Sequence, residues 1–248
     1  MTPRFPKQAR SNFNRIDQSI LCRILIASLL LISTAVTHAD ILGKLELSTE
    51  RVYRGISQTD NNLAPSVSVR LRPENGTFKG AYVGALLHRN DFRNPENARE
   101  QTYFVGYRPE LNGRLRLDAS YIYYDLQQSS GVGDRDWSEA HLRLSVNQSS
   151  ALVLSAANNW IGNGTTYQVE INHLHPLTNH LSIQALAGVV IAPDDAIDGY
   201  GFGELGVIYG ITPKIYARTD ASFTSSKAED LFQDRADSTV RLSIGYIF

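Results

Sequence analysis

The carboxyl-terminal segment Val240-Arg-Leu-Ser-Ile-Gly-Tyr-Ile-Phe248 decides the fold class. Apolar residues stand at every second position, with Arg241, Ser243 and Gly245 between them. A period of two is that of a β-strand with one apolar and one polar face. A strand that closes a membrane barrel is paired on both sides and turns its apolar face to lipid, so a chain can end inside it. We therefore expect an all-β, transmembrane up-and-down antiparallel β-barrel.

The amino-terminal residues have the pattern of an export signal. A basic stretch over residues 1–23 is followed by an apolar run over residues 24–36 and then by Thr37-His38-Ala39. A basic region, a short apolar core and small residues before the cleavage point are typical of a signal peptide. The apolar run is shorter than the about 20 residues that a membrane helix needs. We expect residues 1–39 to be a cleaved signal peptide and residues 40–248 to form the barrel domain.

Composition excludes several other classes of protein. The single cysteine, Cys22, lies in the expected signal peptide, so the mature chain would have no thiol chemistry. A formal net charge of −1 without a basic patch argues against a nucleic-acid partner. No later segment has the 18 or so consecutive apolar residues of a membrane helix.

The links between the expected strands alternate in length. The long links are residues 54–63, 88–99, 126–137, 158–165, 192–200 and 224–237. The short links are residues 73–77, 109–113, 147–150, 175–179 and 210–213. Long outer loops and short periplasmic turns are typical of an outer-membrane barrel. Six long and five short links predict about twelve strands, with no helical periodicity anywhere. Aromatic residues near the loops, Tyr53, Tyr123 and Phe223, suggest one of two interfacial girdles.

A secreted β-sandwich or lipocalin-like barrel is the soluble alternative. Its apolar face would point inward and build a core. Local alternation does not separate the two folds, but the loop asymmetry and the terminal aromatic residues favour the membrane barrel.

If the apolar residues face lipid, the charged residues between them line the lumen. The expected lumen cations are Lys44, Arg70, Arg72, Arg116, Arg143, Arg218 and Arg241. The expected lumen anions are Glu46, Glu50, Asp118, Glu139, Glu170, Glu204 and Asp220. Such a set fits either cross-strand ion pairs that stiffen a small barrel or a water-filled pore with separate basic and acidic walls. Arg51 falls on the apolar side, and we expect it near the lipid interface, where an arginine costs about 0–1 kcal/mol.

Residues 49–60, TERVYRGISQTD, resemble the opening of the TorF-like family of porin-like bacterial outer-membrane proteins. Similar family features occur at residues 80–84, 103–107 and 117–124. The motif residues are Tyr53, Arg54, Gly55 and Ser57. The terminal Tyr246 and Phe248 resemble the sorting signal of outer-membrane proteins. The resemblance implies a porin-like protein of the bacterial outer membrane and supplies no catalytic residue.

Other motifs have weaker support. The stretch Gly201-Phe-Gly203-Glu-Leu-Gly206 has dinucleotide-binding spacing, but no helix is expected after it, and glycines suit a curved strand. His180 and Ser182 could belong to a lipid hydrolase, yet the expected topology puts them beside a periplasmic turn. Acidic groups at residues 194–198 and 229–237 could bind calcium or bridge lipopolysaccharide phosphates; flexible, solvated loops explain them more simply.

The sequence therefore predicts a monomeric, non-enzymatic barrel that acts as a passive channel for small polar solutes. The alternatives are a non-conducting structural or adhesive barrel that acts through its outer loops and, more remotely, a lipid-modifying enzyme. We expect outer-membrane lipids, lipopolysaccharide and the barrel-assembly machinery as partners, and no cofactor, metal or nucleic acid.

Overall fold

The computed structural model describes residues 39–91, 99–109, 111–127, 136–147, 149–158, 160, 164–193 and 199–248. All of them belong to one compact unit, Ala39–Phe248. The expected signal peptide lies outside these residues, except for Ala39.

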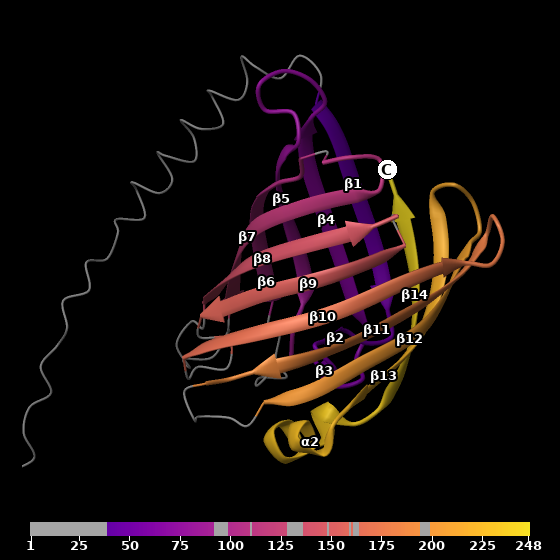
Figure 1. Ribbon diagram of the computed structural model, residues 1–248. Coiled ribbons are helices and arrows are strands. Elements are labelled where there is room, and N and C mark those ends of the chain that lie inside the picture. Colours follow the sequence, from indigo (N-terminus) through magenta and orange to yellow (C-terminus); the bar gives the residue numbers. More distant parts are fainter. Residues whose placement is uncertain are drawn as a thin grey trace, which may run out of the picture. The chain divides into compact units, whose positions relative to one another are not determined.

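A closed barrel of antiparallel strands forms this unit (Figure 1). Its strands are β1 (Ala39–Ser48), β4 (Ala64–Pro73), β5 (Ala81–Arg89), β6 (Arg99–Tyr107), β7 (Leu115–Gln127), β8 (Trp137–Val146), β9 (Ser150–Asn158), β10 (Thr165–Pro176), β11 (Leu181–Ile191), β12 (Tyr200–Gly210), β13 (Ile215–Thr224) and β14 (Thr239–Ile247). Each strand pairs with its neighbours in the chain, and β14 pairs with β1 to close the circle, with Leu45 opposite Tyr246 and Leu47 opposite Ile244. The predicted twelve-stranded barrel, closed by the carboxyl-terminal segment, is confirmed.

The two faces of the barrel wall differ in polarity. Apolar side chains point outward, as in Leu45 and Leu142, which are 47% and 40% exposed. Charged side chains point inward, as in Glu100 and Asp220, which are 1% and 2% exposed. A soluble barrel needs the opposite arrangement, because its core must exclude water. A barrel with an apolar outer face and a charged inner face is typical of the membrane-spanning class, so the observed alternation argues against the soluble alternative.

Glycines in the wall make room for aromatic rings on the adjacent strand. A Cβ at Gly106 would lie 2.3 Å from Cζ of Tyr82, and one at Gly245 would lie 2.2 Å from Cζ of Tyr216. The same relation joins Gly203 to Phe223, at 2.4 Å. The dinucleotide-like glycines thus lie within strand β12, where Gly203 accepts a neighbouring ring, as glycines in a curved β-sheet do.

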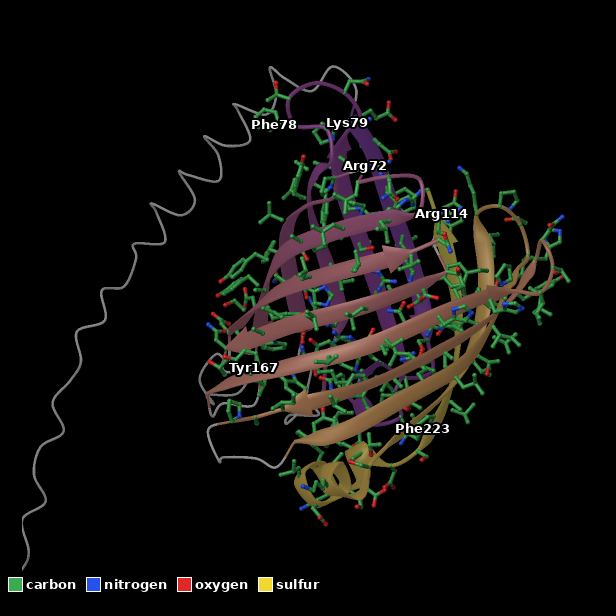
Figure 2. The ribbon with its side chains drawn as sticks, viewed as in Figure 1. Arg72, Phe78, Lys79, Arg114, Tyr167 and Phe223 are labelled. Atoms are coloured by element: carbon green, nitrogen blue, oxygen red, sulfur yellow. The ribbon has the colours of Figure 1, made fainter. Side chains whose placement is uncertain are left out.

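The links gather by length at the two ends of the barrel, which we call the turn end and the loop end. In Figure 2, Phe78 and Lys79 lie at the turn end and Phe223 lies towards the loop end. The last long link contains a short helix, α2 (Ser226–Phe232), and a 3₁₀ turn, η1 (Gln233–Ala236), in a segment where the sequence shows no helical periodicity. No helix in the described part of the chain is long and apolar enough to cross a membrane.

Candidate functional site

The first long link does not extend away from the barrel but folds into its lumen. Strand β1 ends at Ser48, and the chain then forms a hairpin of β2 (Val52–Tyr53) and β3 (Ile56–Ser57). The two residues at its tip, Arg54 and Gly55, have φ values of 55° and 79°. Two successive positive φ values are those of a type I′ turn, which joins closely paired strands. We call residues 52–57 the lumen hairpin.

The lumen hairpin crosses the barrel and is fixed on the far wall by Arg54. The Nη2 atom of Arg54 lies 2.9 Å from Oε2 of Glu139 on β8 and 3.2 Å from Oγ of Ser155 on β9. Its Nε atom donates a hydrogen bond to Gln168 on β10. Strand β9 is diametrically opposite β1 in the strand order, so these contacts span the lumen.

Aromatic residues surround the Arg54 guanidinium. Its central carbon lies 4.8 Å from the ring centroid of Tyr53 and 4.5 Å from that of Trp160, both cation–π distances. The Tyr53 hydroxyl donates a hydrogen bond of 2.9 Å to Glu139. Burial raises the pKa of the Tyr53 phenol well above its ordinary value, so the phenol stays protonated and remains a donor.

Two expectations for this segment were wrong for the same reason. Tyr53 is not part of an outer aromatic girdle, because it lies in the lumen against Glu139. Arg51 does not face lipid but places Nη2 3.3 Å from Oε1 of Glu100, inside the wall. Alternation predicts a side only while the strand continues, and β1 stops before both residues.

The base of the lumen hairpin is held by a buried polar cluster around Glu100 on β6. Besides Arg51, this carboxylate contacts Nε2 of His88 at 2.8 Å and accepts a hydrogen bond of 2.5 Å from Asn90. Glu100 and His88 are 1% and 3% exposed. Neither residue was predicted as part of the site, because both stand beside the long link at residues 88–99, where alternation gives little information.

Four of the predicted lumen residues form a closed ring of ion pairs. Both Arg218 and Arg241 pair with Glu204 and with Asp220. Their Nε atoms lie 2.5 and 3.0 Å from the two oxygens of Asp220, which is 2% exposed. Two guanidinium groups and two carboxylates leave no net charge. At this part of the wall the arrangement is the cross-strand network and not a separated pair of charged walls.

Most of the other predicted lumen residues form an ion pair or a hydrogen bond with a residue close by on the barrel wall. Lys44 and Glu46 form an ion pair of 2.8 Å. Glu50 accepts a hydrogen bond of 2.7 Å from Thr239. Glu170 accepts hydrogen bonds from Gln168 and Asn172, at 2.8 and 3.1 Å. These contacts join neighbouring strands or neighbouring positions of one strand.

The turn end holds a different, more basic group on the wall from β4 to β8. Asp118 forms an ion pair with Arg108 and accepts a hydrogen bond of 2.5 Å from the Tyr82 hydroxyl. The guanidinium carbons of Arg70 and Arg108 lie 5.7 and 5.8 Å from the Tyr82 ring centroid. Neither Tyr82 nor Arg108 was among the predicted lumen residues, because Tyr82 carries no charge and Arg108 follows the end of β6, where alternation stops.

Two predicted lumen cations at the turn end are exposed at the rim. Arg72 pairs with Asp40 at 2.8 Å, and its side chain is 45% exposed. Arg116 is also exposed. Both line a cavity of about 730 Å³ together with Lys79 and Arg108, and we call this cavity the turn-end chamber.

Two further cavities flank the lumen hairpin. One, of about 220 Å³, is lined by Arg54, Glu139 and Gln168, with residues of β12 and β13. The other, of about 390 Å³, is lined by Lys44, Glu46 and residues of β4, β5 and β14. The lumen is thus divided by the hairpin and not filled by side chains throughout.

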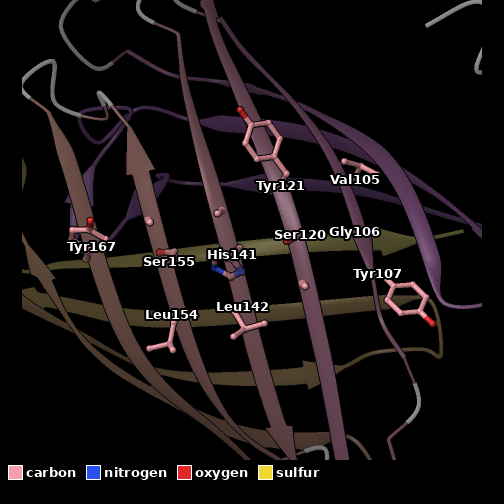
Figure 3. A pocket seen from close by; sticks show the side chains of 13 residues that line it. Val105, Gly106, Tyr107, Ser120, Tyr121, His141, Leu142, Leu154, Ser155 and Tyr167 are labelled. Atoms are coloured by element: carbon pink, nitrogen blue, oxygen red, sulfur yellow. The ribbon is translucent and has the colours of Figure 1, made fainter. Parts of the chain in front are cut away.

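The outer surface carries a shallow apolar groove of about 650 Å³ across β6 to β10. Figure 3 shows Tyr107, Tyr121 and Tyr167 on this wall, with Leu142 and Leu154 between the last two tyrosines. Exposed tyrosines and leucines on a barrel wall suit the acyl chains and the interface of a bilayer.

The described residues contain no group of three or more His, Cys, Asp or Glu side chains placed to hold a metal ion. Nδ1 of His180 lies 3.2 Å from the carbonyl oxygen of Gly210 at the turn end. The acidic residues expected at 194–198 lie outside the described residues, while Glu229 and Asp234 lie in α2 and η1.

Comparisons with known proteins agree on the fold. No protein-family model and no curated protein sequence matches the chain, so the TorF-like resemblance stays a prediction. Among solved structures, a KdgM porin in complex with disordered oligogalacturonate aligns with a TM-score of 0.54 at 9% identity, covering 85% of this chain and 99% of the porin. The NanC porin aligns with a TM-score of 0.52 at 10% identity, covering 84% and 98%. At such identities the likeness shows a shared barrel fold.

Proposed function

We propose that the protein is a porin-like channel of the bacterial outer membrane that lets small polar solutes cross passively, with the lumen hairpin as its constriction. The observation that carries the proposal is a closed barrel with an apolar outside, a charged inside and cavities on both sides of the hairpin. Water-filled polar lumens inside lipid-facing walls are the architecture of porins. Its structural neighbours KdgM and NanC are porins, which supports the same reading.

The proposed orientation puts the turn end in the periplasm and the loop end outside the cell. Short periplasmic turns and long outer loops are the usual arrangement. The terminal rings of Tyr246 and Phe248 stack with centroids 5.9 Å apart at the turn end, where they suit the interface and the assembly machinery. Outer-membrane lipids and lipopolysaccharide would surround the wall, and residues 1–39 would direct export.

Single-channel recording tests the proposal. The protein is overproduced in a bacterial strain that lacks its major porins, extracted from the outer membrane and added to planar bilayers in potassium chloride. A channel gives stepwise current, and liposomes that contain the protein swell in small neutral sugars. Folding is checked by the change of gel mobility on boiling. Folded protein that never gives current steps or swelling would overturn the proposal.

A closed barrel that acts through its outer loops is the second candidate, and the lumen hairpin itself favours it. Its tip is locked on the far wall by Arg54, and Ile56 behind it is fully buried. In that case the protein gives no current steps in planar bilayers. Deletion of residues 226–236, which form α2 and η1, then abolishes the adhesive or structural phenotype. Removal of the same residues from a channel leaves current steps in place.

A further inference from the structure

We infer that the turn-end wall holds a binding site for an anionic group, a carboxylate or phosphate carried by a small solute. The site consists of Arg70, Arg108 and Arg143 around Asp118. The inference rests on the proposed function and names the class of solute that the channel would favour.

The three arginines stand on one continuous wall. Arg70 lies on β4, Arg108 directly follows β6, and Arg143 lies on β8. The charged neighbours of Arg70 are Arg72, Arg108 and Asp118, and those of Arg143 are Arg108, Asp118 and Glu170. Asp118 with Arg108 therefore lies between the two outer guanidinium groups.

The carboxylates at this wall do not satisfy the arginines. Asp118 pairs with Arg108 and also accepts the Tyr82 hydroxyl. Arg70 contacts the face of Tyr82, and no carboxylate lies within ion-pair distance of it among the described residues. Arg143 donates to two neutral partners, at 3.3 Å to Ser145 and at 2.9 Å to Asn172. Three guanidinium groups thus share Asp118, which is already paired, and a second carboxylate, Glu170, lies near Arg143 alone.

The geometry fits a bound anion better than a structural network. A guanidinium carries five donors in a planar fork that matches a carboxylate or phosphate. Arg70 makes no hydrogen bond to another part of the described protein and is held in place only through its contact with the Tyr82 ring. The ring of ion pairs at Arg218 and Arg241 shows the contrast, because there each guanidinium contacts two carboxylates.

Access to the site is provided by the turn-end chamber. Arg108 is shared between the site and the lining of the chamber, which also holds the cations Arg72, Lys79 and Arg116 and one carboxylate, Glu74. A positive rim raises the local concentration of anions and guides them inward. An anionic solute would therefore meet basic groups from the periplasmic rim up to Arg143.

Binding and conduction are measured separately, with sodium glucuronate, inorganic phosphate and neutral glucose as probes. Detergent-solubilised protein is titrated with each probe by calorimetry, and the reversal potential is recorded across bilayers in a potassium chloride gradient. We expect anion selectivity, and binding of glucuronate or phosphate but not of glucose. Tighter glucuronate binding assigns the site to sugar acids, and tighter phosphate binding assigns it to phosphorylated solutes.

The double variant Arg70→Gln with Arg143→Gln tests the residues. It should weaken anion binding at least about tenfold, while Arg70→Lys, which keeps the charge, should retain most of it. Arg114→Gln is the matched control for charge, because Arg114 is an exposed turn residue that does not line the chamber. Equal binding of glucose and glucuronate, or full anion binding by the folded double variant, would overturn the inference. Calorimetric binding by a barrel without current would instead overturn only the proposed channel function.

Discussion

Arg54 and Glu139 form an ion pair across the lumen, with 2.9 Å between Nη2 and Oε2 and with both side chains 2% exposed. The pair connects the link after β1 to strand β8 on the opposite side of the barrel. Arg54 also holds a positive φ of 55°, which costs about 1–3 kcal/mol for a residue other than glycine. The contacts on the far wall therefore keep a strained hairpin across the channel.

Replacement of Arg54 by alanine should release the lumen hairpin and widen the channel. With the hairpin in place Glu139 would be buried without its partner at a cost of about 3–5 kcal/mol, and this cost favours release of the tip, which lets water reach the carboxylate. We expect single-channel conductance to rise about twofold or more and the barrel to unfold at lower urea concentration. Bilayer recording and urea titration followed by gel mobility measure the two effects.

The double variant Arg54→Met with Glu139→Leu is the control for charge burial. It removes both charges, so stability should recover because an apolar pair has no desolvation cost. Conductance should stay raised, because the tip has lost its anchor. Unchanged conductance in the single and in the double variant would show that the hairpin does not limit the current.

Replacement of Gly55 by alanine disturbs the packing of the same hairpin against the barrel wall without a change of charge. A Cβ there would lie 2.5 Å from Cγ2 of Thr224 and 2.9 Å from Cβ of Phe202. We expect the tip of the hairpin to move away from Thr224 and Phe202 and the single-channel conductance to rise, as with Arg54→Ala. Gly76→Ala is the matched control: Gly76 has nearly the same φ, 81° against 79°, but no atom lies within 4 Å of the added carbon. Equal conductance of the two variants would contradict the prediction.

The strands of the barrel wall could be predicted from the sequence, whereas the hairpin that folds into the lumen could not. Alternation in a strand depends on neighbours two residues apart, so the inward positions of Arg218, Asp220 and Arg241 followed from local pattern alone. The strand count followed from the alternating lengths of the links. Both rules act over short distances along the chain.

The lumen hairpin could not be predicted in the same way. Arg54 contacts Gln168, 114 residues away, and that contact depends on the curvature of the closed wall. Alternation places Glu139 inside but does not tell which cation reaches it. A signal existed in Arg54-Gly55, since a glycine next to a polar residue suits a two-residue turn, but the length of the link suggested an outer loop.

Replacement of Asp220 by asparagine should destabilise the ring of ion pairs at Arg218 and Arg241 and make the lumen more positive. Arg218 and Arg241 would then share Glu204 alone, although Asp220 now contacts both at 2.5 and 3.0 Å. We expect a loss of about 3 kcal/mol in the free energy of unfolding and a shift of the reversal potential towards anions. Urea titration and a potassium chloride gradient provide the measurements.

The matched control is Ser243→Ala. Ser243 is uncharged and lines the cavity of about 390 Å³ together with Arg218 and Arg241. This substitution should leave selectivity unchanged. An Asp220→Asn barrel with unaltered selectivity and stability would mean that Asp220 contributes nothing to the balance of charge in the lumen.

Two arginine substitutions on one strand separate a lipid-facing wall from a water-facing one. Leu142 lies in the middle of β8 and Val146 at its end, and both point outward with 40% and 39% exposure. In a bilayer, Leu142→Arg should cost about 2–4 kcal/mol and Val146→Arg about 0–1 kcal/mol, because the cost of a charge falls from the midplane to the interface. Urea unfolding of the barrel in lipid vesicles measures both values. If the wall faced water, an arginine would cost little free energy of unfolding at either position. Equal and small costs for the two variants would therefore contradict a membrane-spanning wall.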